Sequence, residues 1–185
     1  APIWLHPDDT MLWEVVNPDR PVDAPLADGQ EVAVGGTVLR VLHTPGHSPG
    51  GCCLHDADGQ VLFSGDTLFN AGAGNCHNGG NVEEMYATFA GQIATLPDDT
   101  RVYCAHEYTL SNLRFAAAVE PGNAGVLETL DAVRTVQAFA QEVPAANIIV
   151  FPPPAIPGVG NAEGFDFRLQ ALGGRRGRWV PVALL

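Results

Sequence analysis

Three residues of the kinds that bind metals each follow a short apolar run of the sequence. His47, Asp66 and His106 come after strand-like segments, on loops that are exposed yet held by a rigid neighbour. Two imidazoles and a carboxylate that converge at strand ends form a ligand set for a hydrolytic zinc or iron centre. Asp66 offers two oxygens and could bridge two cations. The sequence therefore predicts a metal centre at one edge of a sheet.

Taken alone, such residues also have a non-functional interpretation. A histidine on a loop, such as His47, is more often a surface residue than a ligand. An aspartate in Gly65-Asp66-Thr67 is a common way to cap a turn or a helix. The surrounding sequence decides between the two readings.

The three residues sit in segments that resemble the metallo-β-lactamase superfamily and, within it, the hydroxyacylglutathione hydrolases (glyoxalase II). The segments are HTPGHSPGG at 43–51, LFSGDTLF at 62–69 and VYCAHEY at 102–108. The resemblance implies that His47 binds a first metal, that His106 binds a second, and that Asp66 bridges the two as the catalytic carboxylate. The implied cofactor is zinc, one or two ions per site, with iron or manganese as alternatives.

The same family carries an upstream His-x-His-x-Asp-His motif that supplies most of its metal ligands, and this sequence contains no His-x-His. The three retained ligands would bind two metals weakly, so the site needs more donors. A second copy of the chain could provide them, which predicts a homodimer. Further donors within the chain are expected among its other metal-binding side chains: Cys76, His77, His6, Asp8 and Glu107.

The resemblance also assigns substrate contacts. Tyr108 and Asn112 match positions where glyoxalase II contacts glutathione or packs near it. A basic residue of the family is replaced here by Asn75, and the chain has no Lys. This replacement argues against lactoylglutathione as the substrate. We therefore predict promiscuous hydrolysis of small-molecule esters, thioesters or phosphoesters through a metal-bound hydroxide.

Two other functions remain open at this level. The chain could be a non-catalytic remnant, or one half of a split hydrolase whose partner supplies the missing motif. It could also be an interaction module dominated by its C-terminal segment. Deleting residues 145–185 would separate the last possibility from the first.

The expected fold class is α/β: half of an αββα metallo-β-lactamase sandwich, completed by dimerisation. Half a sandwich would leave one apolar sheet face exposed, and self-association would cover it. Strands are expected at 31–34, 37–42, 52–55, 60–63 and 101–104, bounded by turn residues. Helices are expected at 11–16, 82–96, 110–119 and from 123 to 143, with loops at 17–31 and 70–80. Asp8 or Asp9 should cap the first helix, and Asn81 the second.

The sequence divides into residues 1–125, a truncated metallo-β-lactamase-like domain, and residues 126–185, a helix followed by a β-segment and a tail. Residues 147–170 resemble the porter region of RND-type efflux pumps, which suggests a fusion, a frameshift or an engineered chimera. Phe165, Phe167 and Leu169 alternate at period two and predict an edge strand.

The charge, the apolar runs and the cysteines of the sequence limit the kinds of partner and the cellular location that we expect. The net charge is −12, and all nine basic residues are Arg. Such an acidic chain would repel nucleic acid. No apolar run is long enough for a transmembrane helix and no signal peptide is seen, so we expect no membrane association. The four cysteines lack disulfide or zinc spacing and are expected to be reduced, which fits a cytoplasmic protein.

Overall fold

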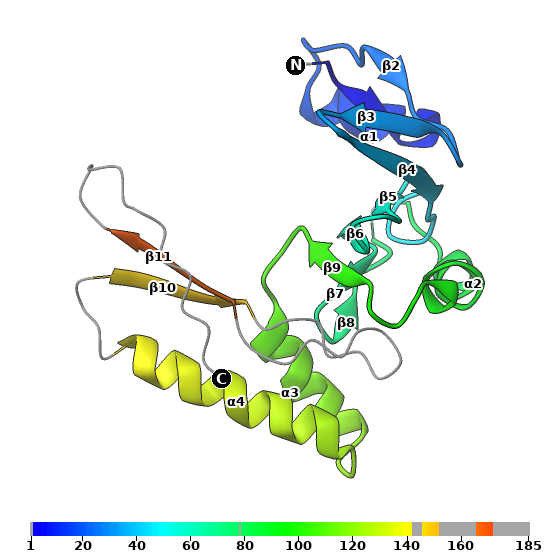
Figure 1. The fold of residues 1–185 in the computed structure, drawn as a ribbon. Helices are drawn as coiled ribbons and strands as arrows, with labels where there is room; N and C mark the ends of the chain where they lie inside the picture. The colour runs from blue at the N-terminus through cyan, green and yellow to red at the C-terminus, as the bar shows by residue number, and fades with distance from the viewer. Residues whose placement is uncertain (1, 78, 142–145, 152–165, 172–185) are drawn as a thin grey trace.

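A five-stranded sheet forms the centre of the protein (Figure 1). The computed structural model describes residues 2–77, 79–141, 146–151 and 166–171. The strand order is β3-β4-β5-β6-β9, in which β3 to β6 are antiparallel neighbours and β9 runs parallel to β6. The bounds of these strands are Glu31–Val34, Thr37–His43, Cys52–Asp56, Val61–Gly65 and Arg101–Cys104. All five strands were predicted, and their ends differ from the prediction by at most two residues.

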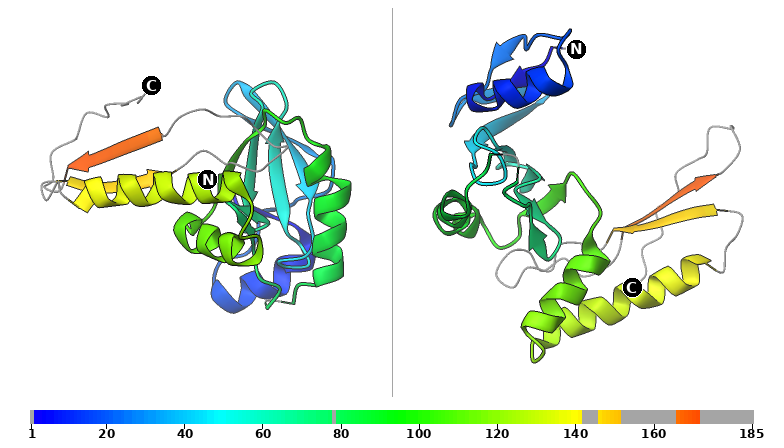
Figure 2. Two further views of the ribbon diagram at one scale, coloured as in Figure 1. Left: turned by 90° about the horizontal axis from the view of Figure 1, so that it is seen from below. Right: turned by 180° about the vertical axis from the view of Figure 1, so that it is seen from behind.

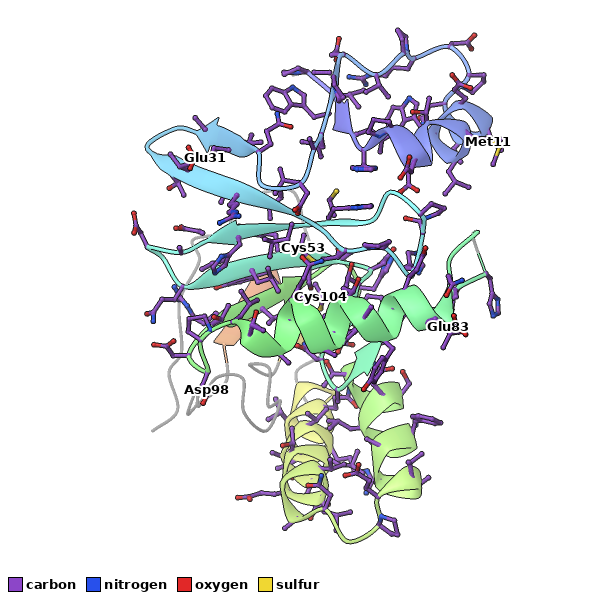
Figure 3. All side chains as sticks on the ribbon, turned by 90° about the vertical axis from the view of Figure 1, so that its right-hand side faces the viewer. Met11, Glu31, Cys53, Glu83, Asp98 and Cys104 are labelled. Carbon is purple, nitrogen blue, oxygen red and sulfur yellow. The ribbon has the colours of Figure 1, made fainter. Side chains whose placement is uncertain are left out.

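One face of this sheet is covered by α2 (Val82–Gly91) and the short η2 (Ile93–Thr95) (Figure 3). A parallel pair cannot be joined by a tight turn, and these helices lie on the connection from β6 to β9. Phe89 and Ile93 pack in one cluster with an apolar residue from each of four strands: Leu42, Cys53, Leu62 and Val102. Asn81 caps α2 as predicted, accepting hydrogen bonds from two backbone N–H groups. Val82 was expected on the buried side of this helix, but it is 71% exposed because it lies in the first, outward-facing turn.

The opposite sheet face is partly open. Leu54, Phe63 and Tyr103 lie in register across β5, β6 and β9, and we call these three residues the open face. Phe63 and Tyr103 are each 44% exposed, and their rings lie 5.7 Å apart. A sheet with helices on one face and an uncovered apolar strip on the other is half of an αββα sandwich. The predicted α/β half-sandwich is therefore confirmed, while its completion by dimerisation stays a prediction.

The N-terminal segment packs against the loop between β4 and β5. It contains β1 (Trp4–Leu5), η1 (Pro7–Asp9), α1 (Thr10–Val16) and β2 (Ala24–Pro25), with β1 and β2 parallel. Asp9 occupies the cap position of α1, but its side chain makes no capping hydrogen bond. Its carboxylate instead accepts hydrogen bonds from Ser48 Oγ and Gly50 N, both at 2.7 Å. Neither Asp8 nor Asp9 caps α1 through its side chain, so that prediction is wrong.

A second correction concerns the glycine-rich loop at 70–80. The chain forms a small hairpin there, in which β7 (Leu68–Phe69) pairs with β8 (Gly72–Ala73). Leu68 and Phe69 are buried under the sheet edge, and this burial holds a hairpin that the polar, glycine-rich sequence alone does not favour.

Two helices, α3 (Thr109–Val119) and α4 (Ala124–Gln141), pack together through a small core of Leu113, Leu130 and Val133. The expected division at residue 125 falls in the first turn of α4. Beyond it, β10 (Ala146–Phe151) and β11 (Asp166–Ala171) form a separate antiparallel pair, away from the five-stranded sheet in both views (Figure 2). The predicted strand therefore exists, but it is not an edge of the central sheet. Residues 152–165 of the porter-like stretch, including Phe165, lie outside the described residues.

No helix in the described part of the chain combines the length and the apolar character needed to cross a membrane.

Candidate metal centre

The parallel pairing of β6 and β9 places the ends of both strands at the same edge of the sheet. Gly65 is in register with Cys104, and Ala105 N donates a 3.0 Å hydrogen bond to Gly65 O. Asp66 directly follows Gly65, and His106 directly follows Ala105. The β4–β5 loop brings His47 to the same edge. The three predicted ligands are therefore close in space although 59 residues separate the first from the last in sequence.

Asp66 lies between the two imidazoles. Its Oδ2 is 3.5 Å from Nε2 of His47, and its Oδ1 is 3.2 Å from Nε2 of His106. The side chains of His47, Asp66 and His106 are 19%, 31% and 50% exposed. Each carboxylate oxygen thus faces one ring nitrogen, with solvent access on the His106 side. This is the arrangement expected of a carboxylate that bridges two cation positions.

The Oδ1 atom of Asp66 is buried and has no hydrogen-bond donor among the described residues. Nε2 of His106 is near it, but the contact lacks the geometry of a hydrogen bond. A buried carboxylate oxygen without a donor is costly unless a cation or a water satisfies it. The donor set, two imidazoles and one carboxylate, fits a zinc, iron or manganese ion.

The ring of His47 is oriented by a backbone group. Its Nδ1 lies 2.6 Å from the carbonyl oxygen of Asn75. A carbonyl can only accept, so Nδ1 carries the proton and Nε2 presents its lone pair toward Asp66. A metal-binding histidine typically donates its other ring N–H to a carbonyl or carboxylate in this way. The contact predisposes His47 to bind a metal through Nε2.

Buried hydroxyl groups hold the loop that carries His47. Thr44 is fully buried and its Oγ1 lies 3.0 Å from Oγ1 of Thr67, the residue after Asp66. Thr88 of α2 donates a 2.8 Å hydrogen bond to Pro45 O. Together with the contacts of Asp9, these bonds fix the loop against the sheet, α2 and the N-terminal segment. The position of His47 is therefore set by the packed core.

An aromatic wall borders the centre. The ring of Tyr108 stacks on His106 at 5.3 Å and meets the edge of Phe69 at 5.4 Å. Tyr108 is 48% exposed, so one side of its ring is open to a ligand. The predicted substrate-contacting residue thus lies beside a predicted metal ligand.

The other predicted substrate contacts have structural partners. Asn112 donates a 3.1 Å hydrogen bond to Asn70 O and supports the β7–β8 hairpin. The Asn75 side chain accepts a 3.0 Å hydrogen bond from His77 N, while its backbone carbonyl orients His47. The contribution of Asn75 to the site is thus made by the main chain.

The additional ligand candidates divide into two groups. Glu107 is exposed and accepts a hydrogen bond from Thr109 N at the start of α3. His77 is also exposed. Cys76 is half-buried. Like the other three cysteines, it forms no disulfide. His6 and Asp8 group with His43 rather than with Asp66. The candidate ligands that the described residues place in contact are therefore His47, Asp66 and His106.

Sequence reasoning missed two contributors to this site. Gly74 packs directly against His47 and Asp66, and Asp9 anchors the loop next to His47. The dense glycines at 70–80 were a signal for Gly74, since close backbone approach often requires glycine. Asp9 gave no such signal, because its partners are about 40 residues away along the chain.

Comparison with known proteins agrees with this architecture. Residues 3–106, more than half of the chain, match the metallo-beta-lactamase superfamily. The chain belongs to this superfamily. Two crystal structures have the same fold over 57% of this chain and 57% of their own: BLEG-1 B3 metallo-beta-lactamase (28% identity, TM-score 0.51) and TTHA1623 in a di-iron-bound form (33% identity, TM-score 0.50).

The chain is also similar to curated enzymes. It is 54% identical over 114 residues to a hydroxyacylglutathione hydrolase of Polaromonas sp., covering 60% of this chain and 43% of the relative. It is 49% identical over 118 residues to a hydroxyacylglutathione hydrolase of Nitrosococcus oceani, covering 63% of this chain and 45% of the relative. The chain thus spans less than half the length of these relatives.

Proposed function

We propose that the protein is a metal-dependent hydrolase whose centre is held by His47, Asp66 and His106. One observation carries the proposal: Asp66 presents one oxygen to each imidazole, and its buried Oδ1 has no hydrogen-bond donor among the described residues. Zinc is the first candidate metal, with iron or manganese as alternatives. The di-iron form of TTHA1623 supports a centre of two ions.

A bound divalent metal would supply Lewis acidity toward the substrate oxygen and lower the pKa of a coordinated water. The residues of the chain serve this chemistry in distinct ways. Asn75 O fixes the proton of His47 on Nδ1 and leaves Nε2 to bind. Asp66 would hold an ion on each of its two oxygens. Tyr108 and Phe69 form an apolar wall that excludes water from one side of His106.

The proposed substrates are small molecules with ester, thioester or phosphoester bonds. The curated relatives are hydroxyacylglutathione hydrolases, which makes a glutathione thioester the first compound to test. His106 is half exposed, and an open site of this kind favours a permissive activity. The net charge of −12 argues against a nucleic-acid substrate. The proposed activity resides in residues 1–125, which contain all three ligands.

A second copy of the chain is the proposed source of the remaining ligands. The open face presents Phe63 and Tyr103, and burying them against a second sheet would complete a two-sheet core. The functional unit on this view is a homodimer. The alternative is a half-domain that becomes active only with a partner carrying a His-x-His motif, and the open face fits that partner as well.

A substrate panel tests the proposal. Purified protein loaded with Zn²⁺ or Mn²⁺ is assayed against 4-nitrophenyl acetate, bis(4-nitrophenyl) phosphate and lactoylglutathione. We expect turnover of at least one compound and a loss of about 100-fold or more in Asp66→Asn, because the bridging carboxylate is removed. The matched control is Asp58→Asn, an exposed aspartate on the β5–β6 turn, which should keep full activity. Absence of activity from a folded, metal-loaded dimer would contradict the proposal.

A further inference from the structure

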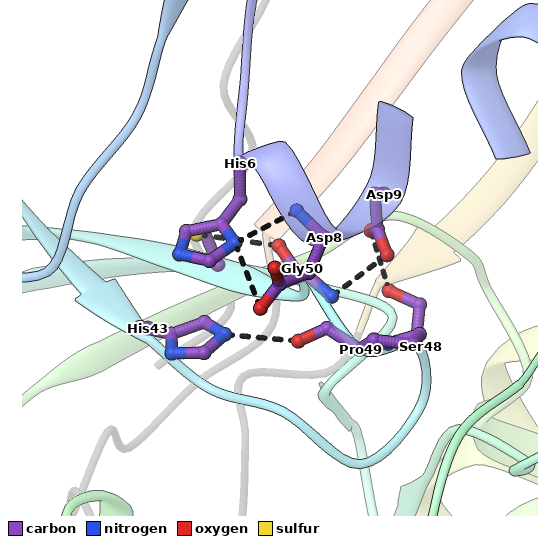
Figure 4. Close-up of polar contacts among 8 residues, drawn as sticks. His6, Asp8, Asp9, His43, Ser48, Pro49 and Gly50 are labelled. Atoms are coloured by element: carbon purple, nitrogen blue, oxygen red, sulfur yellow. Dashed lines mark hydrogen bonds and ion pairs between the residues drawn. The ribbon is translucent and has the colours of Figure 1, made fainter. Parts of the chain in front are cut away.

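A second group of metal-binding side chains lies outside the Asp66 centre. His6 precedes η1, Asp8 lies within it, and His43 ends β4 (Figure 4). One ligand atom from each residue lies within 4.8 Å of the other two. We propose that His6, Asp8 and His43, which we call the His6 cluster, form a separate site for a divalent transition-metal ion.

The geometry brings three donors to one side of a stacked ring pair. The rings of His6 and His43 lie 4.0 Å apart at an angle of 7°. Oδ2 of Asp8 is 3.6 Å from Nδ1 of His6. The His6 side chain is 14% exposed and that of Asp8 is 57% exposed, so the carboxylate is the more solvent-accessible of these two donors. An ion could therefore enter past Asp8 and meet two imidazoles that already lie side by side.

The proton positions show what binding requires. Nδ1 of His6 accepts a long hydrogen bond from Asp8 N, at 3.4 Å, so this nitrogen carries a lone pair and not a proton. Nε2 of His43 lies 2.9 Å from Pro49 O and therefore carries the proton in the metal-free form. Binding through Nε2 shifts that proton to Nδ1 and frees Pro49 O as a fourth, oxygen donor. Because a metal lies in the plane of each imidazole, the two rings must tilt out of their parallel stack.

The local charge favours a cation. Asp28 accepts a 2.9 Å hydrogen bond from His43 N, and Asp9 lies beside the cluster (Figure 4). Their negative field reaches Cys52, which pairs with His43 across β4 and β5. The pKa of Cys52 is raised to about 12 by burial first, then by its neighbour Cys53 and by the carboxylates of Asp9 and Asp28. A positive ion at the cluster would be stabilised by the same field.

The chemistry of the donors selects the ion. Two imidazoles, one carboxylate and one carbonyl oxygen suit Zn²⁺, Ni²⁺ or Cu²⁺ better than Ca²⁺ or Mg²⁺. Such an ion would tie the N-terminal segment to the start of the loop that carries His47. The role of the site is then structural: it closes the contact between η1 and the β4–β5 loop.

Zinc binding to the full chain in an Asp66→Ala background tests this site apart from the Asp66 centre. After equilibrium dialysis against Zn²⁺, we expect roughly one ion per chain. We also expect affinity to fall at least about tenfold in His6→Gln and in His43→Gln. Zinc should raise the melting temperature of the parent and not of these variants. The matched control is His55→Gln on β5, a histidine outside both groups, which should bind zinc as the parent does.

Asp8→Asn guards against a folding artefact, because this exposed side chain can change without disturbing the core. It should keep the melting temperature of the metal-free parent and lose zinc affinity. Zinc binding that survives all three substitutions, or no zinc binding in the Asp66→Ala parent, would overturn the His6 cluster as a metal site. Neither outcome bears on the proposed hydrolase, which depends on Asp66.

Discussion

Gly74 lies so close to His47 that a Cβ atom at position 74 would be 2.7 Å from Nδ1 of the imidazole. The same hypothetical atom would also collide with the backbone carbonyl of Asp66. The chain just after the β7–β8 hairpin can therefore approach both predicted ligands only because residue 74 has no side chain. The close approach also places Asn75 O against His47. The orientation of the ring thus depends on a glycine one residue away.

Gly74→Ala should therefore weaken the metal centre. The methyl group would push the hairpin away from His47 and lengthen its hydrogen bond to Asn75 O. We expect a fall in metal affinity of about 10- to 100-fold, as for other losses of a group that orients a metal ligand. Gly91→Ala is the matched control, since nothing lies within 4 Å of a Cβ there. Equal metal affinity in the two variants, measured by chelator competition, would contradict the steric role of Gly74.

Asp9→Ala should destabilise the folded chain. The change removes the acceptor for Ser48 Oγ and Gly50 N, both of which are in buried residues. Leaving such donors unpaired costs about 1–3 kcal/mol each before water compensates, so we expect a total loss of about 2 kcal/mol in the free energy of unfolding. Urea denaturation measures this loss. Asp19→Ala, an exposed aspartate, should change the midpoint little, and a similar shift in both variants would show that Asp9 is no anchor.

Phe63→Glu should disrupt self-association. The open face leaves Phe63 and Tyr103 each 44% exposed, and a charge in a dimer core would be strongly unfavourable. We expect sedimentation to show a dimer for the parent and a monomer for the variant. Phe115→Glu places the same change on α3, where Phe115 is 70% exposed, and should leave the dimer intact. A monomeric parent would refute the homodimer, and a partner-dependent half-domain would then be favoured.

Alkaline pH should weaken the fold through Cys52. Burial raises the pKa of its thiol from 9.0 to about 12, with smaller contributions from Cys53, Asp9 and Asp28. Below pH 9 the thiol is protonated in both the folded and unfolded chains, so it has no effect on stability. Between pH 9 and 12 the unfolded chain loses the proton first, so the free energy of unfolding falls as pH rises. The denaturation midpoint at pH 10 relative to pH 8 should drop less in Cys52→Ser than in the parent. An identical drop would count against this assignment.

The sequence was sufficient to predict the central sheet and the convergence of the three candidate ligands for one physical reason. Strand runs with period-two burial end in short segments that are rich in metal-binding residues, and the parallel pairing of β6 and β9 then brings Asp66 and His106 together. Both signals are local in sequence. His47 likewise follows a strand-like run, and the resemblance to the superfamily gave all three residues their expected metal-binding roles.

The features that sequence did not reveal depend on contacts between distant segments. Asp9 was predicted as a helix cap, but its carboxylate accepts hydrogen bonds from the buried Ser48 and Gly50 instead of from the helix. His6 and His43 carry no shared motif, and only the docking of η1 on the β4–β5 loop stacks their rings. The β7–β8 hairpin likewise exists because of tertiary burial rather than local propensity.

The most direct test of the account is the metal content of the purified chain after gel filtration, measured by elemental mass spectrometry together with the His6→Gln variant to subtract the second site. We predict roughly one or two ions per chain at the Asp66 centre, lost in Asp66→Ala and retained in Asp58→Ala. A folded protein whose metal content is near zero, or is unchanged by Asp66→Ala, would contradict the claim that His47, Asp66 and His106 form a metal centre.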